Sequence, residues 1–125
     1  MIKKTVPYVD YNGNSKTFTA YFHMNKRELV RFSAPFGGSP DKLQAYINKI
    51  VNKDDLTELV DFVEKIILDS YGIKSEDGSK FEKSPAIREE YSNSEPYAEL
   101  FAQLMQDPNE ANNFFTSIVG AAQAE

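Results

Sequence analysis

Between Leu56 and Tyr71 the chain carries its most regular apolar pattern. Apolar side chains recur three and four residues apart, at Leu56, Leu59, Val60, Val63, Ile66, Ile67 and Tyr71. This spacing gathers them on one face of an α-helix. Phe62 and Leu68 flank the stripe and widen it, and a helix with so broad an apolar face packs against several neighbours. We therefore predict a central helix here, with Gly72 as its left-handed C-terminal cap.

The first 24 residues are predicted to form a β-hairpin. Asn12-Gly13 is a strong turn signal between two runs of alternating polarity. A three-residue loop with Gly13 left-handed gives these strand pairs: Ile2 with Phe22, Lys4 with Ala20 and Val6 with Phe18. This register gathers apolar residues on one face, so we prefer it to a two-residue loop that pairs Val6 with Thr19. Because an isolated hairpin is marginal in water, this one is expected to lie on the helices.

Start and stop signals divide the rest of the chain into further helices. Asn25 and Glu28 have the spacing of a capping box, and Pro35 ends this first short helix. A second helix is expected over about 41–53. Three more helices, each opened by a capping residue and a proline, are expected over 85–93, 95–106 and 108–122.

These elements indicate a small α+β protein. Apolar residues make up 41% of the 125 residues, which is enough for one packed core. We therefore predict a single domain over 1–125, mostly α-helical, with the β-hairpin of 1–24 packed on a helical bundle formed by 25–122.

The chain carries its charge unevenly. Residues 1–53 hold nine Lys/Arg and three Asp/Glu, a net charge of +6, whereas residues 54–125 hold five and sixteen, a net charge of −11. The basic residues are scattered rather than arranged in a stripe, so nucleic-acid binding is not expected. Either this is a solvated dipolar surface, or the basic end docks onto an acidic partner, including the acidic end of another copy. No window is apolar enough for a membrane span, and no export signal is visible.

The most polar run in the chain, YGIKSEDGSKFEKSP, covers residues 71–85. We tested it as a calcium loop of the EF-hand type. With Gly78 at the sixth position, Ile73 stands at the first ligand position and Ser84 at the twelfth, where acids are required. We therefore interpret Asp77-Gly78 as a tight turn within a solvated connection between helices.

Few residues are candidates for catalysis. There is no cysteine, and the single histidine, His23, is accompanied by no motif that supplies a nucleophile and an orienting partner. The glycine pair at 37–38 lacks the Lys-Ser/Thr of a phosphate loop. Acidic side chains lie mostly away from the apolar stripe of the central helix and are expected to be solvated: Asp55, Glu58, Asp61 and Asp69. We expect no catalytic, metal or cofactor site, and no enzyme activity.

The last predicted helix is the candidate for partner binding. Phe114, Phe115, Ile118 and Val119 lie within six residues near the chain end. Adjacent phenylalanines point about 100° apart on a helix, so one is expected to face the core and the other to face a partner. The alternative is that every apolar face packs into one core.

The order of motifs resembles the tail assembly chaperones of long-tailed bacteriophages and prophages, particularly those of Gram-positive hosts. The resemblance covers nearly the whole chain, and it rests on DYNGN, KREL, YINKIV, SYGIKSEDGSKF, SEPYAELFAQLM and NNFFTSIVG. The stretch from Asp69 to Phe81 is the most distinctive, although Asp69 stands where the family leads one to expect a basic residue. PYAELFAQLM has one residue fewer than usual between its alanine and leucine, and the 35–45 loop is longer than usual.

The resemblance implies a non-catalytic role in the host cytoplasm. Such chaperones are thought to bind the tail tape measure protein, to recruit the tail tube protein, and to leave before the virion matures. Self-association into a homo-oligomer is also expected. The alternative is a structural tail or head–tail component that stays in the virion.

Overall fold

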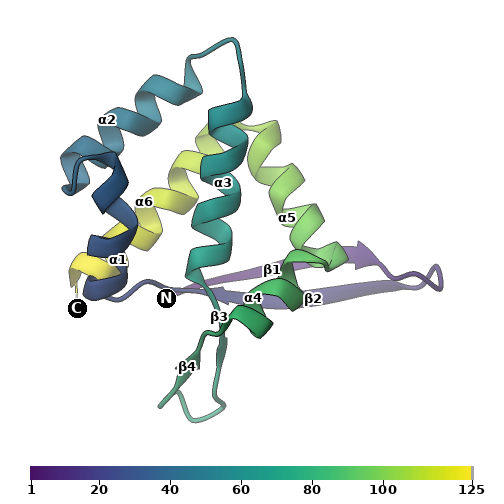
Figure 1. The fold of residues 1–125 in the computed structure, drawn as a ribbon. Coiled ribbons are helices and arrows are strands. Elements are labelled where there is room, and N and C mark those ends of the chain that lie inside the picture. The colour runs from purple at the N-terminus through teal and green to yellow at the C-terminus, as the bar shows by residue number, and fades with distance from the viewer. Residues whose placement is uncertain (125) are drawn as a thin grey trace.

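The computed structural model describes residues 1–124 and confirms a mostly helical α+β fold. Its elements in chain order are β1 (Ile2–Val9), β2 (Ser15–Phe22), α1 (Lys26–Ser33), a short 3-10 helix η1 (Ala34–Phe36), α2 (Pro40–Val51), α3 (Thr57–Ser70), β3 (Tyr71–Lys74), β4 (Phe81–Glu82), α4 (Pro85–Ser92), α5 (Glu95–Gln106) and α6 (Pro108–Ala124). Figure 1 shows α1, α2, α3, α5 and α6 on one side of the β1–β2 hairpin, with β3 and β4 projecting on the other side. No helix among the described residues is long and apolar enough to cross a membrane.

The N-terminal hairpin has the predicted register. Ile2 pairs with Phe22, Lys4 with Ala20 and Val6 with Phe18. Gly13 closes the loop with a φ of 84°, in the left-handed region that favours glycine. The carboxylate of Asp10 accepts hydrogen bonds from two backbone N–H groups of this loop. The face that carries Val6, Ala20 and Phe22 is buried against the helices, as the alternation predicts.

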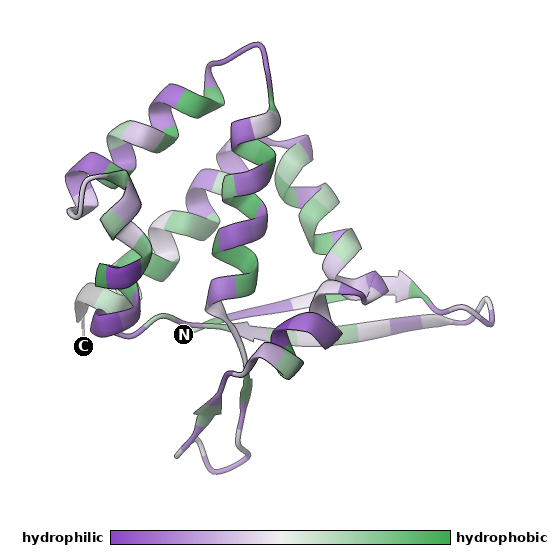
Figure 2. Ribbon diagram, in the orientation of Figure 1, coloured by the Kyte–Doolittle hydropathy of each residue, from purple (hydrophilic) through white to green (hydrophobic). Residues whose placement is uncertain are grey.

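Helix α3 is the centre of the core, as its apolar stripe predicts. Its buried apolar residues are Leu59, Phe62, Val63, Ile66 and Ile67. Leu56, the first residue of the predicted stripe, instead precedes the helix and is 49% exposed. Phe62 is more central than predicted, because four rings lie 5.6–5.8 Å from its own: Phe32, Phe36, Tyr46 and Phe115. Figure 2 shows hydrophobic and hydrophilic residues in alternation along the helices, as expected for helices with one face in a core, and hydrophilic residues in the connections.

The helix starts follow the capping residues. Asn25 and Glu28 form the predicted capping box, with both side-chain-to-backbone hydrogen bonds in place. Ser84 and Ser94 cap α4 and α5, each followed by a proline in the first turn. Ser39 caps α2, so this helix begins one residue earlier than predicted and ends at Val51 rather than at residue 53.

The polar segment after α3 differs from the prediction. It is a second hairpin, β3–β4, and β3 pairs with β2 through Gly72 opposite Tyr21, which completes a four-stranded sheet. The 25–122 segment is therefore not wholly helical. Gly72 is not a left-handed cap, since positive φ angles occur among the described glycines only at 13, 37, 38 and 78. A Cβ at Gly72 would lie 2.6 Å from the ring of Phe81, so the glycine is needed for Phe81 to lie against the backbone.

Candidate partner-binding surface

The predicted partner-binding residues lie in the core. Exposed fractions are 3% for Phe114, 3% for Phe115, 0% for Ile118 and 8% for Val119. The expectation that one phenylalanine faces outward is wrong for this structure. Phe114 packs edge-on against Phe22 of the sheet at 5.1 Å, whereas Phe115 packs against Phe62 of α3 at 5.7 Å.

The reason for this double burial is the position of α6. Helix α6 contacts α1, α2, α3 and α5, so neighbours cover it on several sides. Two rings that point about 100° apart therefore both find a packed environment. Partner contact through Phe114, Phe115, Ile118 and Val119 stays a prediction, and it would require α6 to leave its present position.

An open cleft lies elsewhere, between α1, α3 and the start of α4. We call it the α1–α4 cleft; its volume is about 560 Å³. Five basic side chains line it: Arg27, Arg31, Lys65, Lys83 and Arg88. Two acidic residues, Glu28 and Asp69, lie among them. The apolar part of the lining consists of Met24, Phe32, Leu68, Tyr71 and Pro85.

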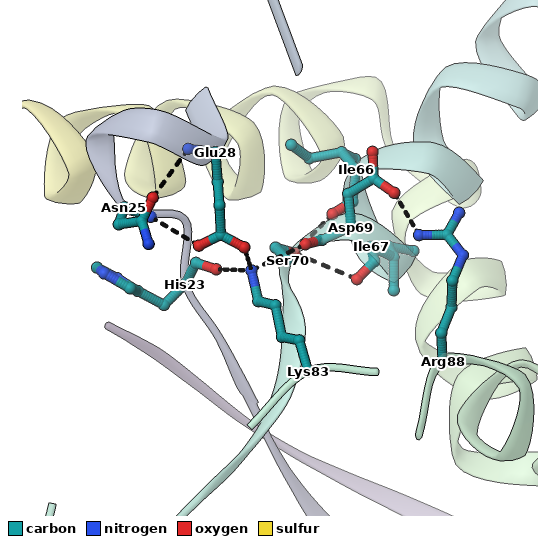
Figure 3. Close-up of polar contacts among 9 residues, drawn as sticks. All are labelled: His23, Asn25, Glu28, Ile66, Ile67, Asp69, Ser70, Lys83 and Arg88. Atoms are coloured by element: carbon teal, nitrogen blue, oxygen red, sulfur yellow. Dashed lines mark hydrogen bonds and ion pairs between the residues drawn. The ribbon is translucent and has the colours of Figure 1, made fainter. Parts of the chain in front are cut away.

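Lys83 ties the elements around the cleft together. Its Nζ donates to Glu28 Oε2 at 2.6 Å, to the carbonyl oxygen of His23 at 2.7 Å and to the carbonyl oxygen of Asp69 at 2.9 Å (Figure 3). These three acceptors use all three donors of an ammonium group. Lys83 therefore joins the ends of β2 and α3 to α1 and α4. Because its donors are all used within the protein, its role at the cleft is structural and it has no donor left for a ligand.

Asp69 pairs with two further cations, and its single negative charge balances one of them. Its carboxylate forms an ion pair with Lys65 at 3.0 Å. It also forms an ion pair with Arg88 (Figure 3). Asp69 is expected from the sequence to be solvated; its side chain is 25% exposed, and it also has an ion-pair partner that the sequence did not indicate, because α4 brings Arg88 to it from 19 residues away. The acid at this position thus links α3 to α4.

Arg27 and Arg31 are the basic residues of the cleft that form no ion pair among the described residues. Both are exposed on α1, and within residues 1–124 neither side chain makes an ion pair or a side-chain hydrogen bond. They stand one helical turn apart, so they project from the same face. Sequence reasoning counted them among scattered basic residues and missed them; their four-residue spacing on a capped helix was the available signal.

Tyr71 contributes an aromatic ring to the lining of the α1–α4 cleft. Its ring stacks on Tyr91 with centroids 3.8 Å apart and planes 6° from parallel. Burial, and to a smaller extent the charge of Glu90, raises the pKa of Tyr71. The ring therefore stays neutral at physiological pH and presents an apolar surface to the cleft.

The other residues singled out in the sequence have local structural contacts. Asp55 accepts hydrogen bonds from Thr57 at the start of α3, and the His23 ring lies edge-on to Phe81 at 6.2 Å. In the loop between β3 and β4, Asp77 accepts from the backbone N–H of Ser79 and from nearby hydroxyls, which lowers its pKa to about 2. The described residues contain no group of three or more His, Cys, Asp or Glu that could hold a metal ion.

Comparison with known protein families gives a match to this chain. A family model described as phage tail assembly chaperone matches residues 1–124, which is nearly the whole chain. No curated protein and no solved structure matches.

Proposed function

The chain belongs to the phage tail assembly chaperone family, and we propose that in this role it binds the tail tape measure protein while the tail tube assembles around it. The observation that carries the proposal is the family match over residues 1–124, because it includes every strand and helix described above. The recruited partner is the tail tube protein. Self-association accompanies this role, so several copies act along one tape measure protein.

We propose that this role is non-catalytic and belongs to the host cytoplasm before the virion matures. The use of charged side chains supports a binding role. Lys83, Asp69 and Arg88 hold elements together around an open cleft, and a cleft with basic and apolar walls suits a protein segment with acidic and apolar side chains.

The four apolar residues of α6 enter this proposal under one condition. Phe114, Phe115, Ile118 and Val119 are buried in the described conformation, so they contact a partner only if α6 detaches. Hydrogen exchange separates the two cases. Slow exchange along α6 in the presence of the partner leaves the α1–α4 cleft as the binding surface, whereas partner-induced fast exchange favours α6.

The experiment that tests the function is co-expression with the tape measure protein of the same phage. We expect a tagged chaperone to retain the tape measure protein on an affinity column and to raise its soluble yield. Mass spectrometry of purified virions is the second arm. The chaperone should be absent from mature particles, whereas a fixed number of copies per particle would identify a structural tail or head–tail component.

A further inference from the structure

The α1–α4 cleft concentrates positive charge in a molecule that is negative as a whole. Five basic side chains face two acidic ones in the cleft, whereas the chain carries a net charge of −5. Both acids are already used, Glu28 by Lys83 and Asp69 by Lys65 and Arg88. The five cations exceed the two acids by three charges, and Arg27 and Arg31 are the two cations that form no ion pair among the described residues.

The spacing of Arg27 and Arg31 suits a ligand that is itself helical. Arg27 and Arg31 lie four residues apart on α1, so their guanidinium groups are separated by about one helical turn. Two carboxylates one turn apart on a second helix have the same separation. Each guanidinium presents paired N–H donors that match the two oxygens of a carboxylate.

The apolar wall selects an amphipathic ligand. Met24 and Phe32 line the cleft but are almost fully buried, so Leu68, Tyr71 and Pro85 supply most of its accessible apolar surface. A volume of about 560 Å³ holds a few side chains rather than a whole helix. A ligand helix would therefore lie across the opening and insert apolar side chains beside its carboxylates.

We propose that the α1–α4 cleft binds an acidic amphipathic helix, with carboxylates one turn apart on Arg27 and Arg31. The proposal rests on the chaperone function above, since it gives the chemical class of the protein segment that the chaperone holds. A nucleic acid fits less well, because residues 54–125 carry a net charge of −11 that repels a continuous phosphate backbone.

The test uses the full chain and a labelled synthetic helix of about 20 residues, long enough to be helical alone. One peptide carries a leucine stripe flanked by glutamates four residues apart, and a matched peptide carries lysines in their place. Fluorescence anisotropy gives the affinity of each peptide for the wild type, for Arg27→Glu/Arg31→Glu and for Lys26→Glu/Lys42→Glu. The last variant has the same charge change, but Lys26 borders a different hollow of the surface and Lys42 lies on α2.

We expect the wild type and the lysine variant to bind the glutamate peptide within about twofold of each other, and the arginine variant to bind it about tenfold or more weakly. The lysine peptide should show the reverse preference and bind the arginine variant best. Equal binding of both peptides by the wild type, or equal loss in both variants, would overturn the proposal. Circular dichroism must show that both variants are folded; if the arginine variant is not, Arg27→Gln/Arg31→Gln replaces it.

Two further readouts separate other occupants of the cleft. Tighter binding of an oligonucleotide than of the glutamate peptide, lost in the arginine variant, would assign the cleft to nucleic acid. Conversion of an oligomer to a monomer by Arg27→Glu/Arg31→Glu without any peptide would assign it to a second copy. If the peptides fail but the tape measure protein still co-purifies, the helix proposal is wrong and the chaperone function stands.

Discussion

The surroundings of α6 and the α1–α4 cleft use their side chains in opposite ways. Around α6, Phe114 and Phe115 are each 3% exposed and packed against other rings. In the cleft, Arg27 and Arg31 are exposed and without an ion pair among the described residues. The apolar stripe of α6 thus contributes to the fold, whereas the binding surface that we propose depends on charges of the short helix α1. Substitutions in the two regions should therefore separate stability from partner binding.

The largest effect is expected in the α6 region. Phe115→Asp places a charge where the native side chain is 3% exposed, and this should unfold the protein at a cost of more than about 4 kcal/mol. The neighbouring Thr116→Asp is the control, since Thr116 is exposed and should tolerate the change. Thermal unfolding by circular dichroism measures both. A folded Phe115→Asp variant that has lost its partner would make α6 the interface and reverse the comparison.

A smaller loss of stability is expected where α3 crosses the core. Ile67 is fully buried, so Ile67→Ala should lower the free energy of unfolding by about 2–4 kcal/mol, as truncation leaves a cavity. Leu56 is 49% exposed, and Leu56→Ala should change stability by about 0.5 kcal/mol or less. Urea denaturation gives both values. A negligible cost at Ile67 would mean that the α3 stripe is not the centre of the core.

A still smaller loss of stability is expected for a residue of the cleft that has a structural role. Lys83 holds α1, α3 and α4 together at the cleft, with its side chain 22% exposed. Lys83→Met keeps the aliphatic stem but removes three hydrogen bonds, so stability should fall by about 1–3 kcal/mol. Lys80→Met, in the exposed β3–β4 loop, should be close to neutral. Stability unchanged by Lys83→Met would show that the cleft does not depend on this tether.

The smallest effect on stability is expected in the β3–β4 loop, which belongs neither to the surroundings of α6 nor to the α1–α4 cleft. Hydrogen bonds from Ser79 and Ser75 lower the pKa of Asp77 to about 2 from 3.8. Because the folded pKa is the lower one, Asp77 contributes stability above pH 3.8, and this is lost as the pH falls towards about 2. NMR titration should find the depressed midpoint, and Ser79→Ala should raise it. A midpoint near 3.8 in the wild type would mean that the turn is not held by this carboxylate.

Local signals in the sequence predicted much of the fold. The register of the β1–β2 hairpin follows from Asn12-Gly13 and the alternation of apolar residues, both read within 24 residues. The capping box at Asn25 and the caps at Ser84 and Ser94 likewise depend on neighbours three residues away. Each of these features is decided by its own segment, so no tertiary information is needed.

The features that were missed depend on distant parts of the chain. Strands β3 and β4 have four and two residues, too few for a period to be recognised. The need for Gly72 becomes visible only when the ring of Phe81 is placed against it. The α1–α4 cleft combines charges from α1, α3 and α4. Its excess of basic over acidic side chains therefore becomes visible only when the helices are in place.

The most direct test of the central claim, that the partner binds in the cleft and not on α6, is quantitative co-purification of the tape measure protein with three chaperones. The wild type and Lys26→Glu/Lys42→Glu should retain equal amounts, whereas Arg27→Glu/Arg31→Glu should remain folded and retain about one tenth or less. Equal retention by all three would contradict the account, because the partner would then bind without the two arginines of the cleft that form no ion pair among the described residues.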